Sequence, residues 1–212
     1  HLKDTKEKLE SGEEIIGLPT GITELDELTE GLRDGQLWVV GAMTSGGKSA
    51  LMMNIVNSIL NKGKKASVYS LEMSQNSIIA RLLGIRMNIS TTDIVKLIAD
   101  KARVWKEIQK LKEEGLKIYS SDFAQLETMM MSIVRDVSRG KTDAVFIDYI
   151  QLMSAKSGMG ETEKLDYISR ELRLLAGRTN VPIFLLSQLS NESVNNPRET
   201  AGFRGSGMIA MV

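Results

Sequence analysis

Three short runs of this sequence are apolar at every position: residues 37–40, 144–147 and 181–186. A strand without a polar side is buried on both faces, which is typical of a parallel sheet covered by helices. Between these runs, apolar residues recur at three- and four-residue spacing over 49–61 and 126–137, which predicts amphipathic helices. We therefore predict an α/β fold in which a mostly parallel twisted sheet is flanked by helices on both faces.

Weaker signals complete the alternation of strands and helices. Ser74 is a plausible N-cap for one helix, and Gly115 is expected to end another. The remaining elements are predicted, in chain order, over 66–71, 74–83, 105–111, 116–119 and 165–175.

Two further local patterns concern a short helix and a run of methionines. Ile22, Leu25 and Leu28 lie at helical spacing, and Gly31 or Gly35 is expected to end that short helix. The three consecutive methionines at 129–131 are expected to fill the core rather than to bind a cofactor.

The composition excludes several kinds of chemistry. The chain has 212 residues, no cysteine and a single histidine, His1. A Ser-His-Asp triad or a Cys-His pair therefore lacks its base, and zinc sites built from Cys and His are excluded. A metal is expected to be a hard cation held by Asp, Glu or Ser oxygens.

The charge balance and hydropathy point to a soluble protein. Lysine and arginine together number 27, as do aspartate and glutamate, so the net charge is zero. This argues against binding nucleic acid by bulk charge, although a local basic loop remains compatible with it. No apolar run is long enough to span a membrane and no signal peptide is evident, so a cytoplasmic location is expected.

A glycine-rich turn lies between the strand over 37–40 and the helix over 49–61. It reads Ala42-Met43-Thr44-Ser45-Gly46-Gly47-Lys48-Ser49, which is a P-loop pattern with Ala in place of the first Gly. Backbone N–H groups of such a loop cradle phosphate oxygens, the lysine reaches the β- and γ-phosphates, and the serine binds Mg²⁺. The predicted nucleotide-binding residues here are Ser45, Gly46, Gly47, Lys48, Ser49 and Ala50.

Three polar residues follow predicted strands and are expected at the same edge of the sheet. Asp148 ends the apolar strand over 144–147 and is expected to hold Mg²⁺ together with Ser49. Glu72 follows another strand and is the candidate catalytic carboxylate. Gln188 follows a third strand and is the candidate contact to a γ-phosphate.

Several segments together resemble the ATPase domain of DnaB-family replicative helicases. The resemblance covers about residues 15–207. Its most specific piece is the Walker B run from Ile147 to Met153. The other segments are Leu18-Pro19-Thr20-Gly21, Leu32-Arg33-Asp34-Gly35-Gln36-Leu37, Ser70-Leu71-Glu72-Met73 and Leu186-Ser187-Gln188-Leu189.

This resemblance implies a RecA-like P-loop core in a homohexameric ring, with Mg²⁺–ATP bound between subunits. It implies translocation in the 5′ to 3′ direction along single-stranded DNA, unwinding of duplex DNA, and a primase and a helicase loader as partners. By position, Glu72 activates water with Lys48 at the phosphates, Gln188 senses the γ-phosphate, and Arg81 contacts the nucleotide.

The resemblance also implies a DNA-contacting loop in the polar segment over 190–207. Here Gly205 replaces the glutamate of the family's Arg-Glu-Ser-Gly pattern. A loop of this kind follows the DNA backbone without reading its sequence. The candidate DNA-binding residues are Arg198, Arg204, Gly205, Ser206 and Gly207.

The ends of the sequence suggest a piece of a longer protein. The chain starts with His1, and its apolar end over 208–212 is expected to be an unfinished strand or helix. We expect residues 1–14 to form a linker helix or arm and 15–212 to form the ATPase domain. By resemblance, the collar domain precedes His1 and the arginine finger acting in trans follows Val212.

Other function classes share parts of this pattern. A recombinase, a clock-type ATPase or a helicase loader also has a P-loop and an apolar Walker B strand, but the Asp148-Tyr149-Ile150-Gln151-Leu152-Met153 run and the context of Glu72 disfavour these. A small-molecule kinase would need an arginine-bearing lid and an acceptor pocket, and neither is identifiable. A nucleotide-gated structural ring subunit would require Glu72 or Gln188 to lie away from the γ-phosphate.

Overall fold

The chain folds around one parallel sheet. The structure is a computed structural model that describes residues 16–43, 45–90, 93–94, 101–155, 158–189 and 207–210. Six strands lie in the order β3-β2-β4-β5-β1-β6, and each neighbouring pair is parallel. The strands are β1 Leu37–Ala42, β2 Ala66–Ser70, β3 Leu116–Tyr119, β4 Ala144–Asp148, β5 Ile183–Gln188 and β6 Gly207–Ala210.

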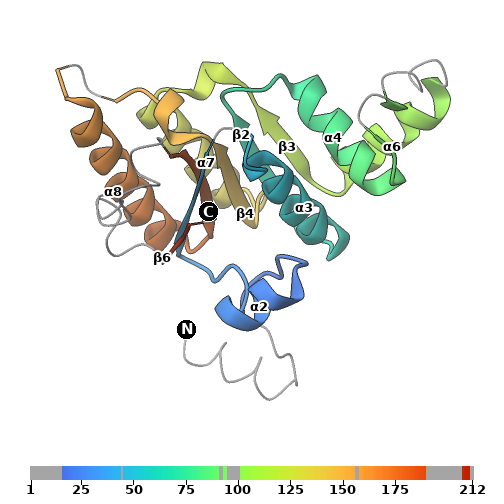
Figure 1. Ribbon diagram of the computed structural model, residues 1–212, viewed down its shortest axis with the longest axis horizontal. Helices are drawn as coiled ribbons and strands as arrows, with labels where there is room; N and C mark the ends of the chain where they lie inside the picture. The colour runs from blue at the N-terminus through green and yellow to red at the C-terminus, as the bar shows by residue number, and fades with distance from the viewer. Residues whose placement is uncertain are drawn as a thin grey trace.

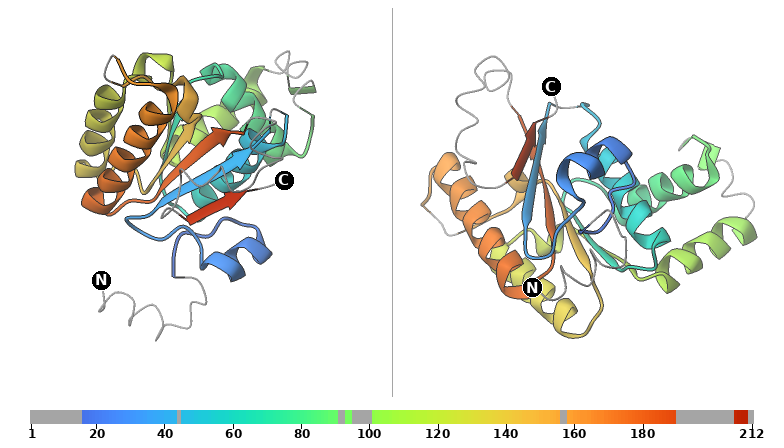
Figure 2. Two further views of the ribbon diagram at one scale, coloured as in Figure 1. Left: turned by 60° about the vertical axis from the view of Figure 1, so that its left-hand side comes forward. Right: turned by 90° about the horizontal axis from the view of Figure 1, so that it is seen from below.

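Helices cover both faces of the sheet (Figures 1 and 2). Side chains alternate along β1, so Trp38 and Val40 join one hydrophobic cluster while Leu37 and Val39 join the other. This double burial confirms the predicted α/β fold. The first cluster is covered by α3 Lys48–Asn61, α4 Gln75–Met87 and α6 Lys101–Glu113, and the second by α7 Leu126–Ser138 and α8 Glu161–Thr179.

The predicted helix signals at two positions are confirmed. The Ser74 hydroxyl accepts a hydrogen bond from the N–H of Ser77 and caps α4. Gly115 follows α6 with φ 92°, a left-handed conformation that favours glycine. Three shorter elements complete the described part: α2 Thr23–Thr29 and the 3₁₀ turns η1 Ser121–Phe123 and η2 Ile150–Leu152.

The expectation that all three methionines at 129–131 fill the core is wrong. Met129 is fully buried, but Met131 is 66% exposed, because consecutive helical residues are about 100° apart and cannot all face one core. Leu28 is 80% exposed on α2. That helix ends with Glu30 in the left-handed conformation (φ 59°), one residue before the expected Gly31.

The last described segment is a strand. Residues 207–210 pair with β1, with Gly207 opposite Trp38, so the apolar end of the chain adds β6 to the edge of the sheet. Residues 1–14, the predicted linker or arm, lie outside the described residues. Among the described helices, none combines the length and the apolar character needed to cross a bilayer.

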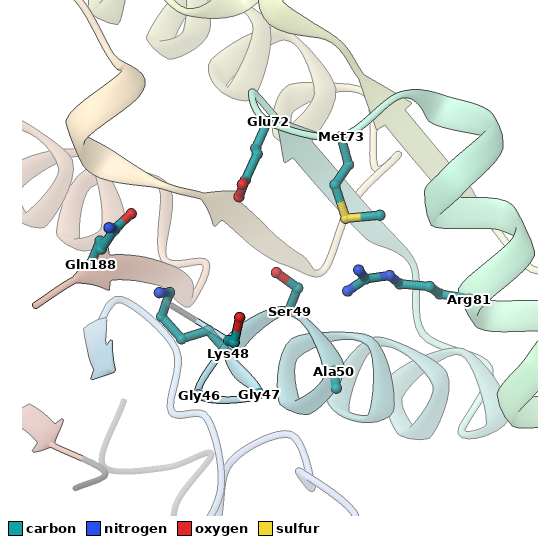
Figure 3. A pocket seen from close by; sticks show the side chains of 10 residues that line it. Gly46, Gly47, Lys48, Ser49, Ala50, Glu72, Met73, Arg81 and Gln188 are labelled. Atoms are coloured by element: carbon teal, nitrogen blue, oxygen red, sulfur yellow. The ribbon is translucent and has the colours of Figure 1, made fainter. Parts of the chain in front are cut away.

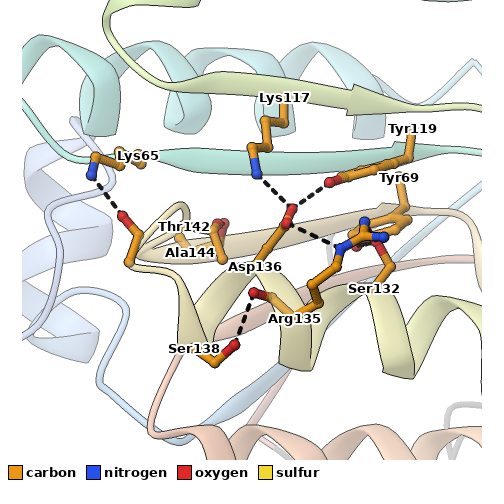
Figure 4. Close-up of polar contacts among 11 residues, drawn as sticks. Lys65, Tyr69, Lys117, Tyr119, Ser132, Arg135, Asp136, Ser138, Thr142 and Ala144 are labelled. Carbon is orange, nitrogen blue, oxygen red and sulfur yellow. Dashed lines mark hydrogen bonds and ion pairs between the residues drawn. The ribbon is translucent and has the colours of Figure 1, made fainter.

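A buried carboxylate fastens the opposite edge strand, β3, to α7 (Figure 4). Asp136 accepts hydrogen bonds from the Tyr119 hydroxyl and from Lys117 Nζ at 2.9 Å. The Tyr119 ring stacks on Tyr69 with centroids 4.5 Å apart, and the Tyr69 hydroxyl donates to Ser132 at 3.0 Å. An ionic and aromatic network therefore holds the edge of the sheet.

Candidate active site

The carboxyl ends of the parallel strands meet at one edge of the sheet, where open α/β sheets bind ligands. A cavity of about 330 Å³ opens there (Figure 3). Its walls come from the β1–α3 turn, the end of β2, α4 and the end of β5. The lining residues are Ser45, Gly46, Gly47, Lys48, Ser49, Ala50, Glu72, Met73, Arg81 and Gln188.

The turn from β1 into α3 forms the floor of this cavity. Gly46 N–H donates to the Met43 carbonyl at 3.0 Å, which closes the turn. A Cβ at Gly46 would lie 2.9 Å from that carbonyl oxygen. Gly47, with φ 82°, precedes the first residue of α3. The unpaired N–H groups of the α3 N-terminus therefore face a site that favours an anion.

Lys48 is placed to bring a positive charge to this anion site. Its Nζ donates to the carbonyl oxygens of Ala42 at 3.0 Å and Met43 at 3.3 Å. It also lies 6.0 Å from the centre of the Tyr149 ring. Because its bonded partners are neutral carbonyls, a phosphate oxygen could displace them with a stronger charge-assisted hydrogen bond.

Asp148 lies beneath the cavity and is fully buried. Ser49 Oγ donates to its Oδ2 at 2.8 Å, whereas Oδ1 has no hydrogen-bond partner within the described chain. Burial raises the pKa of Asp148, the Ser49 hydrogen bond opposes this, and the nearby negative charge of Glu72 raises the pKa further. An ionised carboxylate here is poorly compensated by the protein alone.

The donor set at this position suits a hard divalent cation. A hydroxyl oxygen and a carboxylate oxygen stand side by side, and the second carboxylate oxygen is left over. Mg²⁺ is usually held by one or two carboxylates together with phosphate oxygens and water. Ser49 and Asp148 therefore fit a magnesium ion that accompanies a bound nucleotide.

Glu72 and Arg81 lie across the cavity from the P-loop glycines (Figure 3). Leu71 N–H donates to the Asp148 carbonyl at 2.8 Å, so the ends of β2 and β4 stay together and Glu72 follows directly. The Glu72 side chain is exposed and lines the cavity, so water can reach its carboxylate. Arg81 extends from α4 into the same space.

The structure brings together the residues predicted for nucleotide chemistry. The predicted P-loop residues 45–50, Glu72, Arg81 and Gln188 share the cavity, and Asp148 is joined to it through Ser49. Sequence reasoning missed Met73, which lines the wall next to Glu72. Its position in the turn after β2 was the available signal.

Of the five predicted DNA-binding residues, the structure describes only Gly207. Arg198, Arg204, Gly205 and Ser206 lie outside the described residues. Gly207 begins β6 opposite Trp38, near the start of β1, and so lies toward the amino edge of the sheet rather than at the cavity.

Comparisons with known proteins agree with this geometry. The family described as "DnaB-like helicase C terminal domain" matches residues 17–211. The replicative DNA helicase DnaB of Helicobacter pylori is 36% identical over 189 residues, which are 86% of this chain and 38% of that protein. The DnaB of Geobacillus stearothermophilus is 32% identical over 183 residues, 84% of this chain and 40% of that protein. The chain thus spans about two fifths of the length of these relatives.

Two solved structures share the fold. One, described as an ATPase domain, has a TM-score of 0.80 and 26% identity, covering 97% of this chain and 77% of that one. The other, a DnaB-like replicative helicase studied for its interactions with primase, has a TM-score of 0.76 and 26% identity, covering 92% and 49%. These likenesses confirm the predicted RecA-like fold.

Proposed function

This chain belongs to the DnaB-like helicase C-terminal domain family, and from that premise we propose that it is the ATP-driven motor domain of a replicative DNA helicase. One observation carries the proposal: Lys48, Glu72 and Gln188 converge on one cavity from three separate strand ends. A P-loop used only to hold a nucleotide would not need the carboxylate and the amide as well.

ATP binds with its phosphates on the P-loop. Backbone N–H groups over 45–50 hold the phosphate oxygens, and Lys48 exchanges its carbonyl partners for the β- and γ-phosphates. Arg81 adds positive charge at the α4 side of the cavity. Mg²⁺, when bound through Ser49 and Asp148, would neutralise phosphate charge.

Hydrolysis requires a group that activates the attacking water. Glu72 is the carboxylate that lines the cavity, and it can orient water and accept its proton. Gln188 can donate its amide hydrogens to the γ-phosphate and thereby distinguish ATP from ADP. The two residues come from strands on opposite sides of β4, so a γ-phosphate between them is contacted from two directions.

We propose further that six subunits form a ring and move along single-stranded DNA in the 5′ to 3′ direction. The family supports this assembly, as it supports a DNA contact through Arg198, Arg204, Gly205, Ser206 and Gly207. A structural neighbour is a helicase studied for its interactions with primase, which supports a primase as a partner, and we propose a helicase loader as a further partner from the family resemblance alone. A cytoplasmic location follows from such a role.

The first test measures phosphate release from ATP with and without single-stranded DNA. We expect DNA to stimulate hydrolysis, and Glu72→Gln to lower the rate at least about 10²-fold because the general base is lost. Lys48→Ala should abolish nucleotide binding. Glu113→Gln, on the exposed face of α6, is the matched control and should leave the rate unchanged.

Two results would contradict the proposal. Turnover that is independent of DNA and unchanged in Glu72→Gln would argue against a helicase motor. A monomeric mass by light scattering in Mg²⁺–ATP, together with phosphoryl transfer to a small acceptor, would favour the kinase alternative. Arg204→Ala should weaken DNA binding in a salt-dependent manner and leave nucleotide binding intact.

A further inference from the structure

The hydrogen-bond ladder between β4 and β5 stops before β5 ends. The last register pair is Ile147 with Leu185, and β4 ends at Asp148. β5 continues to Gln188, and on its other side β1 pairs with it as far as Ala42 opposite Gln188. The last residues of β5 therefore lose a strand neighbour on the β4 side, next to the cavity.

The side chain of Gln151 takes the place of the missing strand. Its Oε1 accepts from the N–H of Gln188 at 3.1 Å, and its Nε2 donates to the carbonyl of Gln188 at 2.9 Å. Nε2 also lies 3.0 Å from Ser187 Oγ. One amide group thus satisfies both main-chain groups of a single residue, and only one orientation of the amide can do so.

The opposite side of the same main chain is held by the P-loop strand. Leu189 N–H donates to the Ala42 carbonyl at 3.1 Å, and this oxygen also accepts from Lys48 Nζ at 3.0 Å. The backbone at 188–189 is therefore fixed between Gln151 and the end of β1, and the Gln188 side chain lines the cavity from this anchored position.

Gln151 lies close in sequence to another residue of the site. It lies in η2, only three residues after Asp148, the buried carboxylate beside Ser49. The same short segment thus provides the Asp148 carboxylate and the Gln151 amide that bonds to the main chain of Gln188. Any shift of this segment changes both together.

We propose that Gln151 is a positioning residue that holds Gln188 at the distance and direction needed to contact a γ-phosphate. The inference rests on the proposed function, because it assigns Gln151 a role in the same ATP site. Gln151 does not line the cavity, and its amide is bonded to Ser187 and Gln188. It acts through Gln188.

The residue type is specific to this role. Leucine has nearly the same size but neither donor nor acceptor, so both main-chain groups of Gln188 would lose their partner. Glutamate keeps an acceptor for the Gln188 N–H but, when ionised, places negative charge against the Gln188 carbonyl oxygen. The two variants therefore remove the hydrogen bonds to the Gln188 main chain in different ways, and both retain much of the side-chain volume.

The experiment compares the Kd of Mg²⁺–ATPγS with that of Mg²⁺–ADP. In Gln151→Leu and Gln151→Glu we expect the preference for ATPγS over ADP to fall at least about tenfold, the effect of one hydrogen bond to a charged group. The Kd of ADP should stay unchanged, which also shows that each variant is folded. Gln75→Leu is the matched control, because it removes a Gln side-chain bond to the Ile118 carbonyl, remote from Gln188.

A double variant decides whether Gln151 acts through Gln188. Gln151→Leu combined with Gln188→Ala should lose no more preference than Gln188→Ala alone. An unchanged preference in Gln151→Leu, or additive losses in the double variant, would overturn the inference and leave the proposed function standing. Failure of the unaltered protein to bind either nucleotide would instead overturn the proposed function.

Discussion

Two aspartates of this protein are buried to a similar degree, but their carboxylate oxygens differ in the partners that surround them. The Asp136 side chain, on α7, is 3% exposed and is contacted by Tyr119 and Lys117. Asp148, at the end of β4, is 0% exposed, and among the described residues Ser49 bonds one of its two oxygens while the other has no hydrogen-bond partner. The Asp136 carboxylate therefore has hydrogen-bond and ion-pair partners, whereas the Asp148 carboxylate, next to a residue of the cavity wall, lacks a partner for one oxygen among the described residues.

The pKa values of the two groups move in opposite directions. Burial would raise the pKa of Asp136, but the hydrogen bonds from Tyr119 and Lys117 and the positive charge of Lys117 outweigh it, so the pKa is lowered. Burial raises the pKa of Asp148, and its single hydrogen bond does not offset this. A buried charge with a full set of partners stabilises the fold, while one with too few is available to a ligand.

The largest effect that tests this contrast is on catalysis. Asp148→Asn should lower ATP hydrolysis by about 10³-fold, because the buried position would lose the charge that we propose to hold Mg²⁺. The same change should raise the free energy of unfolding of the ligand-free protein by about 1 kcal/mol, because an undercompensated charge is removed. Phosphate release and urea unfolding measure the two quantities. A variant that is both inactive and less stable would contradict the inference that the Asp148 charge is poorly compensated in the ligand-free protein.

The same substitution at the other aspartate should affect stability alone. Asp136→Asn removes the negative charge opposite Lys117 and turns an amide N–H group toward either Lys117 or Arg135, so we expect the free energy of unfolding to fall by about 2 kcal/mol. The Kd of Mg²⁺–ATPγS should not change, because Asp136 lies on the β3 side of the sheet, away from the cavity lining. If nucleotide affinity fell together with stability, the two regions would be coupled.

The sequence allowed Asp148 to be predicted as a candidate site residue, but it did not indicate the buried contacts of Asp136. Asp148 ends an apolar strand, and parallel strands bring such residues to one edge, so the rule that places it needs no tertiary contact. The same rule placed Glu72 and Gln188, and the P-loop was predictable because its residues are contiguous. The order of the strands, by contrast, follows from packing that a periodic pattern does not encode.

Asp136 and Gln151 could not be identified in the same way. Asp136 lies on a helix whose apolar pattern suggested only core packing, and its partners on β3 are 17 and 19 residues away in sequence. Gln151 contacts Gln188 across 37 residues, at a gap in the sheet that depends on where β4 ends. Both depend on the relative lengths and register of strands, which the sequence does not specify locally.

A smaller effect should appear when the pH is lowered in the absence of nucleotide. The folded pKa of Asp136 lies below its unfolded value of about 3.9, so its stabilisation is present above that value and is lost as the pH falls through the folded pKa. The folded pKa of Asp148 is raised, so its destabilising charge is removed on acidification at a higher pH.

Urea unfolding of the unaltered protein and both Asn variants from pH 7 to pH 3 resolves these two contributions. On acidification, the stability gained by Asp148→Asn should disappear first, and the stability lost in Asp136→Asn should shrink only at lower pH. Differences that vanish at the same pH would mean that the two carboxylates share one environment.

The smallest predicted effect concerns which partners of Asp136 matter. Arg135 Nε lies 3.7 Å from Asp136, and the Arg135 side chain is 48% exposed, so solvent screens this pair. Arg135→Ala should therefore lower the free energy of unfolding by no more than about 0.5 kcal/mol. Tyr119→Phe, which removes a partly buried hydrogen bond to the carboxylate, should lower the free energy of unfolding by about 1.5 kcal/mol. Equal losses of unfolding free energy in the two variants would show that nearby positive charge stabilises Asp136 more than its hydrogen bonds do. The difference between Asp136 and Asp148 would then be a difference in surrounding charge, not in hydrogen bonding.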